Sequence, residues 1–222
     1  MDNKTAVVVV DFQGDFTSLE KGFLAVAGTD KSYVDEVNKA VKGLRKAGFP
    51  IIATQDWHPK DHMSFFTNTP GKEAFDLLEL DDGRDQVLWP PHCVQNTKNA
   101  GILLDEDLLD GVIKKGTDPK YDSYSGFFDD GGIKTGLEDL LIKKGIKTLL
   151  VFGLAADYCV RATVLDGIKQ GFGVILVRDL CRGVAEETTR AALEQMEAAG
   201  AVLLDRLPDN LSDMAVSSLG HF

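Results

Sequence analysis

The sequence predicts an α/β protein in which a mostly parallel sheet of roughly six strands is covered by helices on both faces, a three-layer α/β/α sandwich. Short aliphatic runs alternate along the chain with longer segments whose apolar residues recur every three or four positions. The runs are continuously apolar, as expected of strands buried on both faces. No linker, repeat or shift in composition divides the 222 residues, so we expect a single domain over residues 1–222.

The first part of the chain predicts two strands and one helix. Residues 6–10 are an alanine followed by four valines, and residues 50–54 form a second short apolar run. Between them, residues 32–47 carry one apolar face at helical spacing, made of Val34, Val37, Val41 and Leu44. Gly48 is expected to end this helix.

The second part repeats the alternation after a long irregular stretch. Residues 55–100 lack sustained periodicity, and a loop of this length in a compact domain is usually functional or disordered; its tryptophans, phenylalanines and histidines favour a functional loop. Further strands are expected at residues 111–115, 148–152, 174–177 and 201–204, and helices at 136–144, 157–170 and 185–199. The tail after Pro208 is weakly patterned.

Composition excludes several classes of function. The formal net charge of -11 argues against general affinity for nucleic acid and for anionic membrane surfaces. Three cysteines, Cys93, Cys159 and Cys181, do not make a disulfide framework in a chain of this length. The N-terminus lacks the features of a signal peptide, and no apolar run is long enough to span a membrane. We therefore expect a cytoplasmic protein whose partner is a small molecule.

Three histidines and one aspartate are concentrated in the long loop. Asp56 and His58, at positions i and i+2, would point the same way from an extended backbone. His62 is near enough to fold back, and His92 would arrive from the far side of the loop. Imidazole and carboxylate together suit zinc, iron or manganese. The alternative is a set of surface histidines beside prolines, and Cys93, next to His92, is a further candidate ligand.

Four chemically suggestive residues stand at or just beyond the predicted strand ends: Asp11, Asp56, Lys115 and Cys159. In parallel sheets, ligands bind beyond the carboxyl ends of the strands. Because these residues are far apart in sequence, their convergence at the carboxyl ends of the strands is the strongest sign of an active site.

Cys159 is the candidate nucleophile. It follows a strand that stops at Gly153, and a helix is expected to begin near it. The N–H groups and partial positive charge of a helix N-terminus would stabilise a thiolate, and they could also bind the oxyanion of a tetrahedral intermediate. The alternative is a buried cysteine that acts as a small apolar residue.

The histidines are assigned to a metal, so an aspartate and a lysine would have to activate the thiol. Asp11 is the candidate general base, with Asp15 as its rival. One of the adjacent lysines Lys114 and Lys115 should face inward from its strand, where it would favour ionised carboxylate and thiol. Aromatic side chains from loops on the same side could wall a flat pocket: Phe16, Trp89 and Tyr124.

Taken together, these residues resemble a known family. The chain is similar to the nicotinamidases, metal-containing members of the isochorismatase-like cysteine hydrolases, from the first strand to about residue 205. The resemblance rests on residues 11–16 (Asp-Phe-Gln-Gly-Asp-Phe), 56–58 (Asp-Trp-His), 61–62 (Asp-His), 89–93 (Trp-Pro-Pro-His-Cys), 115–116 (Lys-Gly), 124–127 (Tyr-Ser-Gly-Phe) and 153–160 (Gly-Leu-Ala-Ala-Asp-Tyr-Cys-Val).

The resemblance implies a Rossmann-like fold and a specific set of site residues. The implied catalytic residues are Asp11, Lys115 and Cys159, and the implied metal ligands are Asp56, His58, His62 and His92, with water completing the shell. The backbone N–H groups of Ala155 and Cys159 would form the oxyanion hole, and a cis peptide would precede Ala155. Phe16 and Trp89 would sandwich a pyridine ring, with Tyr124 as a further substrate-binding residue.

The activity implied by the resemblance is hydrolysis of nicotinamide to nicotinate and ammonia through a thioester, a reaction of NAD salvage. One divalent ion is implied, with zinc as the first choice and iron or manganese as alternatives. A related amidase for ureido or N-carbamoyl substrates, or a non-catalytic metal-binding protein, is the rival function. The sequence leaves open whether pyrazinamide is also cleaved and whether the chain forms a homo-oligomer.

Overall fold

The computed structural model describes residues 4–208, 210 and 211. Within them a six-stranded sheet has the order β5-β2-β1-β6-β7-β8, and each neighbouring pair is parallel. Its strands are β1 (Thr5–Val10), β2 (Ile51–Asp56), β5 (Gly111–Lys115), β6 (Thr148–Leu154), β7 (Gly173–Arg182) and β8 (Val202–Leu204). The predicted α/β class with a parallel sheet of roughly six strands is confirmed.

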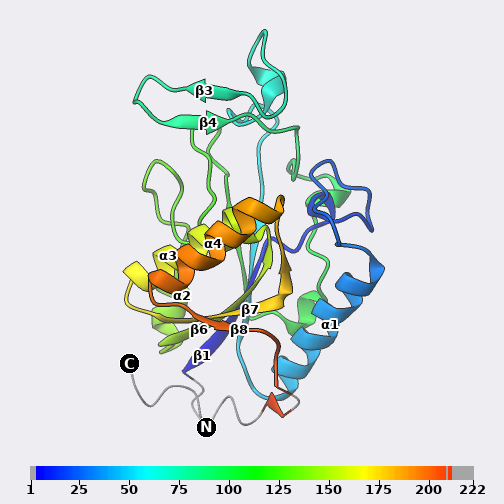
Figure 1. Cartoon of the computed structure of the whole chain (residues 1–222), viewed down its shortest axis with the longest axis vertical. Helices are drawn as coiled ribbons and strands as arrows, with labels where there is room; N and C mark the ends of the chain where they lie inside the picture. Colours follow the sequence, from blue (N-terminus) through cyan, green and yellow to red (C-terminus); the bar gives the residue numbers. More distant parts are fainter. Residues whose placement is uncertain (1–3, 209, 212–222) are drawn as a thin grey trace.

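Helices cover both faces of this sheet (Figure 1). Helix α1 (Lys31–Lys46) lies on one face, and α2 (Leu137–Lys143), α3 (Arg161–Lys169) and α4 (Glu186–Ala198) lie on the other. The chain crosses from β1 to β2 in one direction and from β5 through β8 in the opposite direction. Because such crossovers are almost always right-handed, opposite directions place the helices on opposite faces.

The elements form where the sequence pattern predicts them. Every residue of β1 is buried, which explains its continuous run of valines. The Asp30 side chain caps α1 by accepting hydrogen bonds from the N–H groups of Ser32 and Tyr33. Just beyond the helix, Gly48 has a φ of +88°, a conformation that glycine adopts without steric cost.

Three details differ from the sequence prediction. The long loop contains a two-stranded antiparallel hairpin, β3 (Leu77–Glu79) and β4 (Asp85–Val87), which projects at the top of Figure 1. Its three-residue strands are too short to show a periodic pattern. The strand expected at residues 174–177 is longer in the structure: β7 extends to Arg182, past an irregularity in its pairing with β6. The helix expected from residue 157 begins as a π-helical turn, η5 (Ala156–Val160), before α3.

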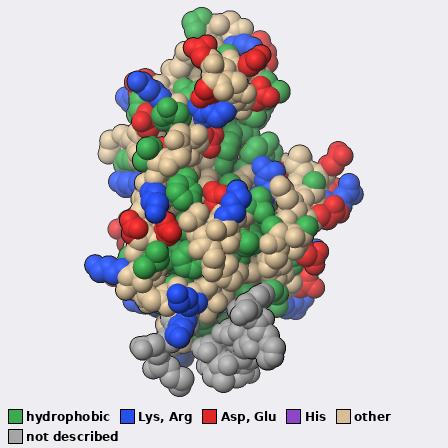
Figure 2. Space-filling model, turned by 90° about the vertical axis from the view of Figure 1, so that its left-hand side faces the viewer, with side chains coloured by type: hydrophobic (Ala, Val, Ile, Leu, Met, Phe, Trp, Pro, Cys, Tyr) green, Lys and Arg blue, Asp and Glu red, His purple; other side chains and the backbone are tan. Residues whose placement is uncertain are grey.

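The surface shown in Figure 2 carries interspersed acidic and basic side chains, and hydrophobic side chains gather just below the uppermost part of the molecule. None of the helices in the described residues is both long and apolar enough to cross a membrane. The weakly patterned tail after Pro208 lies outside the described residues, apart from Asn210 and Leu211.

Candidate active site

The carboxyl ends of β1 and β6 meet at the middle of the sheet. Val10 pairs in register with Gly153, so the residues that follow these two strands start side by side. After β1 the chain forms β2 and β5, which lie on one flank of β1 within the sheet. It forms β6, β7 and β8 later, and these lie on the other flank. Such a reversal of strand order leaves a crevice beyond the strand ends, which is where open α/β sheets bind ligands.

Lys115 lies at the centre of a buried polar cluster in this crevice. Its Nζ is 2.6 Å from Oδ1 of Asp56, 3.0 Å from Oδ2 of Asp11 and 3.5 Å from Sγ of Cys159. It also donates a hydrogen bond of 2.5 Å to the carbonyl oxygen of Ser123. Lys115 and Asp56 are partners in the pairing of β5 with β2, so the register of the parallel strands brings these two side chains together.

The two rival residues left open by the sequence have other partners. Lys114 is exposed, and its Nζ lies 3.9 Å from the centroid of the Trp57 ring, a cation–π arrangement. Asp15 accepts a hydrogen bond of 2.7 Å from the backbone N–H of Cys93. The polar contacts of Lys115 include neither side chain.

Asp11 is held in an unusual backbone conformation, with a φ of 45°. Its N–H bonds to Oγ1 of Thr54 at 3.1 Å, and the Thr54 hydroxyl donates to Oδ1 of Asp11 at 2.6 Å. Oδ2 faces Lys115 and has no hydrogen-bond partner in the described structure. Burial raises the pKa of Asp11 to about 6, against the opposing effect of Lys115. Asp11 can therefore be ionised at neutral pH and accept a proton.

The Cys159 thiol is buried within reach of that carboxylate. Ligand atoms of Asp11, Asp56 and Cys159 all lie within 4.8 Å of one another. Burial raises the pKa of Cys159 well above its ordinary value, and Lys115 lowers it only in part. We expected the surroundings to stabilise the thiolate, but burial favours the neutral thiol more strongly than Lys115 favours the thiolate. A thiol of this kind needs a base at hand before it can act as a nucleophile.

The turn that carries Cys159 also carries the predicted oxyanion-hole amides. The peptide bond between Leu154 and Ala155 is cis, as the family resemblance implies. The N–H groups of Tyr158 and Val160 both bond to the carbonyl oxygen of Ala155, each at 3.1 Å, which shapes η5. Ala155 and Cys159 both line one cavity, which is described below.

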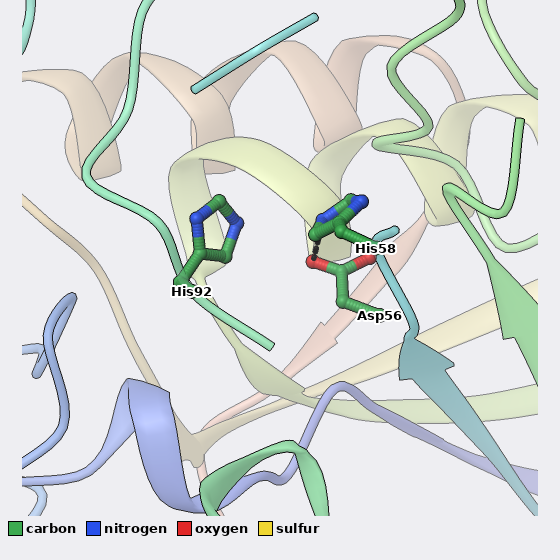
Figure 3. Close-up of side chains that lie close together, drawn as sticks. All are labelled: Asp56, His58 and His92. Carbon is green, nitrogen blue, oxygen red and sulfur yellow. Dashed lines mark ion pairs between the residues drawn. The ribbon is translucent and has the colours of Figure 1, made fainter. Parts of the chain in front are cut away.

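Three of the four predicted metal ligands form one buried group. Atoms of Asp56, His58 and His92 that could bind an ion lie within 4.8 Å of one another. Figure 3 shows Asp56 at the end of β2 with His58 beside it, and His92 on a separate loop. The distance from Nε2 of His58 to Oδ2 of Asp56 is 3.6 Å. Two imidazoles and a carboxylate are a donor set that suits a divalent metal.

The hydrogen bonds of two histidines leave a nitrogen free for an ion. Nδ1 of His58 lies 2.9 Å from the carbonyl oxygen of Gly116, and Nδ1 of His92 lies 2.8 Å from that of Pro90. Because a carbonyl oxygen only accepts, both Nδ1 atoms must carry the proton. In the neutral form of each ring, Nε2 then keeps a lone pair, which is the arrangement seen in metal-binding histidines. The residues present therefore fit a divalent metal.

His62 is the predicted ligand that the structure does not bring into this group. Its Nε2 lies 3.1 Å from the carbonyl oxygen of Tyr121, and its Nδ1 lies 2.8 Å from Oγ of Ser64. Its ring nevertheless packs close to His58, with ring centroids 4.3 Å apart. The alternative ligand Cys93 is buried and belongs to neither of the candidate groups found in the described residues.

A cavity of about 300 Å³ opens onto both the thiol and the metal group. Phe16, Trp89 and Tyr124, the predicted aromatic residues, all line it. Nε1 of Trp89 donates a hydrogen bond of 3.0 Å to the hydroxyl of Tyr124, which fixes two walls relative to each other. Asp56, His92 and Cys159 also border the cavity. It can therefore hold a planar aromatic molecule between the two reactive groups.

Several lining residues were missed by the sequence analysis. Tyr158 packs edge-on against Trp89, with ring centroids 5.2 Å apart, and its position beside Cys159 could have signalled it. Asp122 is buried at the cavity wall and accepts a hydrogen bond of 2.8 Å from Gln86 in β4, which ties the hairpin to the site. The Ser123 carbonyl that binds Lys115 is a backbone group and leaves no signal in the sequence.

Comparison with known proteins gives one consistent family. The model of the isochorismatase domain matches residues 5–206. The chain is 43% identical over 203 residues to the nicotinamidase of Escherichia coli, and this match covers 89% of the chain and 93% of the relative.

Solved structures resemble this chain over most of their length. L. infantum PnC1, in complex with nicotinate, is 35% identical with a TM-score of 0.78, and the match covers 92% of this chain and 93% of that one. The pyrazinamidase of Pyrococcus horikoshii, in complex with zinc, is 36% identical with a TM-score of 0.74, and the match covers 90% of this chain and 98% of that one.

Proposed function

The chain belongs to the isochorismatase family, and we propose that it is a nicotinamidase, a hydrolase that converts nicotinamide to nicotinate and ammonia. The observation that carries this proposal is the cavity shared by two groups: a buried thiol beside an aspartate and a lysine, and a carboxylate with two histidines. Nicotinamide has a group for each of them: its carboxamide can meet the thiol, and its ring nitrogen can face the carboxylate and histidines.

The first half of the reaction would acylate Cys159. Asp11 takes the proton from the thiol, and the ammonium group of Lys115 stabilises the charges that form beside it. Sulfur attacks the carboxamide carbon, and the backbone N–H groups of Ala155 and Cys159 receive the oxyanion. Asp11 then returns its proton to the amide nitrogen, the C–N bond breaks, and ammonia leaves a thioester on Cys159.

The second half would release the acid. Asp11, again ionised, takes a proton from a water molecule as that water attacks the thioester carbon. The same backbone N–H groups hold the second oxyanion. When the C–S bond breaks, the proton on Asp11 returns to sulfur and the thiol is restored. The product leaves as the carboxylic acid, which releases its proton to solvent and becomes nicotinate.

We assign the metal to Asp56, His58 and His92, with His62 as the fourth candidate ligand, whose Nε2 would have to leave the Tyr121 carbonyl. A bound divalent ion would supply a Lewis-acid anchor for the pyridine nitrogen. Zinc is the first choice because the Pyrococcus horikoshii relative binds it, and the donor set also suits iron and manganese. Phe16 and Trp89 would hold the ring, and Tyr124 fixes the Trp89 indole.

The direct test measures ammonia release from nicotinamide by the purified protein. Activity should fall after chelation and return when zinc, iron or manganese is restored. Cys159→Ala should lower turnover by about 10⁵-fold or more, the size of loss known for a removed nucleophile, and its metal content should match that of the unaltered protein. Turnover retained by this variant would rule out the thioester route.

The same assay separates the rival functions. An amidase for ureido or N-carbamoyl compounds would release ammonia faster from those substrates than from nicotinamide, whereas a metal-binding protein without catalysis would release none from any amide. Pyrazinamide carries the same planar carboxamide and is the next substrate to compare, as the Pyrococcus horikoshii relative is a pyrazinamidase.

A further inference from the structure

The carboxylate of Asp157 connects the turn that carries Cys159 to another helix. Asp157 is 4% exposed and stands two residues before the thiol. Its Oδ1 accepts a hydrogen bond of 3.0 Å from the N–H of Val184, and its Oδ2 accepts bonds from the N–H of Ala185 at 3.3 Å and the hydroxyl of Thr188 at 2.5 Å. All three donors belong to the start of α4 or to the residues just before it.

Helix α4 has no cap of its own. The residue at its N-cap position is Ala185, which has no side-chain oxygen to accept from the first N–H groups. Asp157 bonds instead to the backbone just before the helix, at Val184 and Ala185, and to the Thr188 hydroxyl in its first turn. Its negative charge also suits the positive end of the helix. By contrast, α1 is capped locally by Asp30, which accepts from the N–H groups of Ser32 at 3.0 Å and Tyr33 at 3.2 Å.

The same carboxylate fixes two borders of the cavity. On one side it lies within η5, whose backbone places Cys159 and Ala155 next to each other. On the other side it holds the backbone of Val184, a further lining residue of the cavity. A shift of η5 relative to α4 would therefore move the thiol away from the aspartate and lysine, which are fixed on other strands.

We propose that Asp157 is a positioning residue that holds the Cys159 thiol and the neighbouring amides in register with Asp11 and Lys115. It does so by pinning η5 to the start of α4, and it touches neither substrate nor metal. Its kinetic consequence rests on the proposed function, but the position of the thiol can be measured without any amide substrate. The same bonds also stabilise α4, so the test must separate placement of the thiol from general stability.

The experiment compares two aspartates that bond to the starts of helices. Asp157→Asn keeps the size of the side chain but loses its charge and one acceptor. Asp30→Asn makes the same change at α1, at a residue that is not among those lining the cavity. The rate at which iodoacetamide alkylates Cys159 is followed by mass spectrometry of the Cys159 peptide, alongside kcat and KM for nicotinamide. Rates are normalised to the folded fraction, measured by circular dichroism at the assay temperature.

We expect Asp157→Asn to lower both the alkylation rate and kcat by about tenfold, because small misplacements of a reacting group cost one to two orders of magnitude. KM should change less than kcat, and Asp30→Asn should leave both rates at the level of the unaltered protein. An alkylation rate per folded molecule that stays unchanged in Asp157→Asn would overturn the proposal.

Thr188 gives a milder pair of variants in case Asp157→Asn does not fold. Thr188→Ser keeps the hydroxyl that bonds to Asp157 and should behave like the unaltered protein. Thr188→Val keeps the shape and loses the bond, and should lower the alkylation rate and kcat by about threefold. Equal rates in these two variants would also overturn the proposal. If nicotinamide is not a substrate, kcat is zero throughout, whereas the alkylation rates still decide the role of Asp157.

Discussion

The carboxyl ends of β1 and β2 are neighbours in the sheet, and each presents a buried aspartate to Lys115. At the end of β1, burial raises the pKa of Asp11 to about 6. At the end of β2, burial would also raise the pKa of Asp56, but Lys115 and His58 together lower it well below its ordinary value. Two residues of the same type, each ion-paired with the same ammonium group, therefore differ in their readiness to bind a proton.

The difference comes from what each second oxygen faces. Oδ2 of Asp56 lies 3.6 Å from Nε2 of His58, whereas Oδ2 of Asp11 faces Lys115, with the Cys159 thiol close to the same carboxylate. Asp11 is thus suited to accept and return a proton, and Asp56 to remain an anion that binds a cation. The neighbours of each carboxylate, rather than its residue type, suit Asp11 to its proposed acid–base role and Asp56 to its proposed role as a metal ligand.

Removing the proton acceptor at the end of β1 should have the largest effect on turnover while leaving metal binding intact. Asp11→Asn keeps the bond to Thr54 but cannot accept a proton, so kcat should fall by about 10³-fold, within the range of general-base contributions. Metal content, measured by atomic emission, should be unchanged because Asp11 is not among the proposed ligands. A variant that lost its metal as well would show that the two strand ends do not act separately.

Removing a ligand beyond the end of β2 should give the complementary result. His58→Ala should lower metal affinity and raise KM for nicotinamide, each by about 100-fold, because the proposed anchor for the substrate ring is lost. The Cys159 alkylation rate should stay near that of the unaltered protein, since the thiol and its base are untouched. Alkylation that slows as much as turnover would contradict the separation.

The acidity of Asp11 predicts a pH dependence of smaller size. The base works only when ionised, and its pKa of about 6 lies above the ordinary value of 3.8. We therefore expect kcat/KM to be nearly level above about pH 7, to fall to about half at pH 6 and to fall by about tenfold at pH 5. The same shift means that Asp11 favours folding below its ordinary pKa and that this contribution is lost as pH rises through 6. Unfolding driven by Asp11 therefore cannot produce the acid limb, and circular dichroism in each buffer checks that the protein stays folded.

Among the proposed metal ligands, His62 should give the smallest effect. Both of its ring nitrogens face protein partners, so His62→Ala should weaken metal affinity by about tenfold, clearly less than His58→Ala. The measurement is competition with a chelator, run on both variants side by side. Equal losses would mean that His62 exchanges the Tyr121 carbonyl for the ion without cost, and that the site at the end of β2 has four equivalent ligands.

The sequence predicted the residues that follow regular strands. A continuous aliphatic run places Asp11 at the carboxyl-terminal end of a buried strand. Because side chains alternate along a strand, only one of the two lysines at 114 and 115 can face inward. In the structure, the pairing of β2 with β5 then accounts for the contact between Asp56 and Lys115. These predictions depend on periodicity and strand direction, which the sequence carries directly.

The contacts that were not predicted depend on chain segments with no periodic pattern. The hairpin that supports Asp122 has three-residue strands, and the acceptor of Lys115 at residue 123 is a backbone carbonyl. The Tyr121 carbonyl that bonds to His62 lies 59 positions further along the chain. The groups that bond to Asp157 lie 27 to 31 positions further along. These contacts depend on how loops and helices pack against the sheet, and no short-range pattern in the sequence predicts them.

The order of strands has a consequence for how the protein is made. Strand β1 lies between β2 and β6, yet β6 ends at Leu154, long after β2 ends at Asp56. At bacterial or eukaryotic rates of translation, the ribosome needs about 5 to 20 s to add the residues between them. Until then one edge of β1 is unpaired in the nascent chain, so its apolar surface is open to chaperones, and no active enzyme can form before most of the polypeptide has been synthesised.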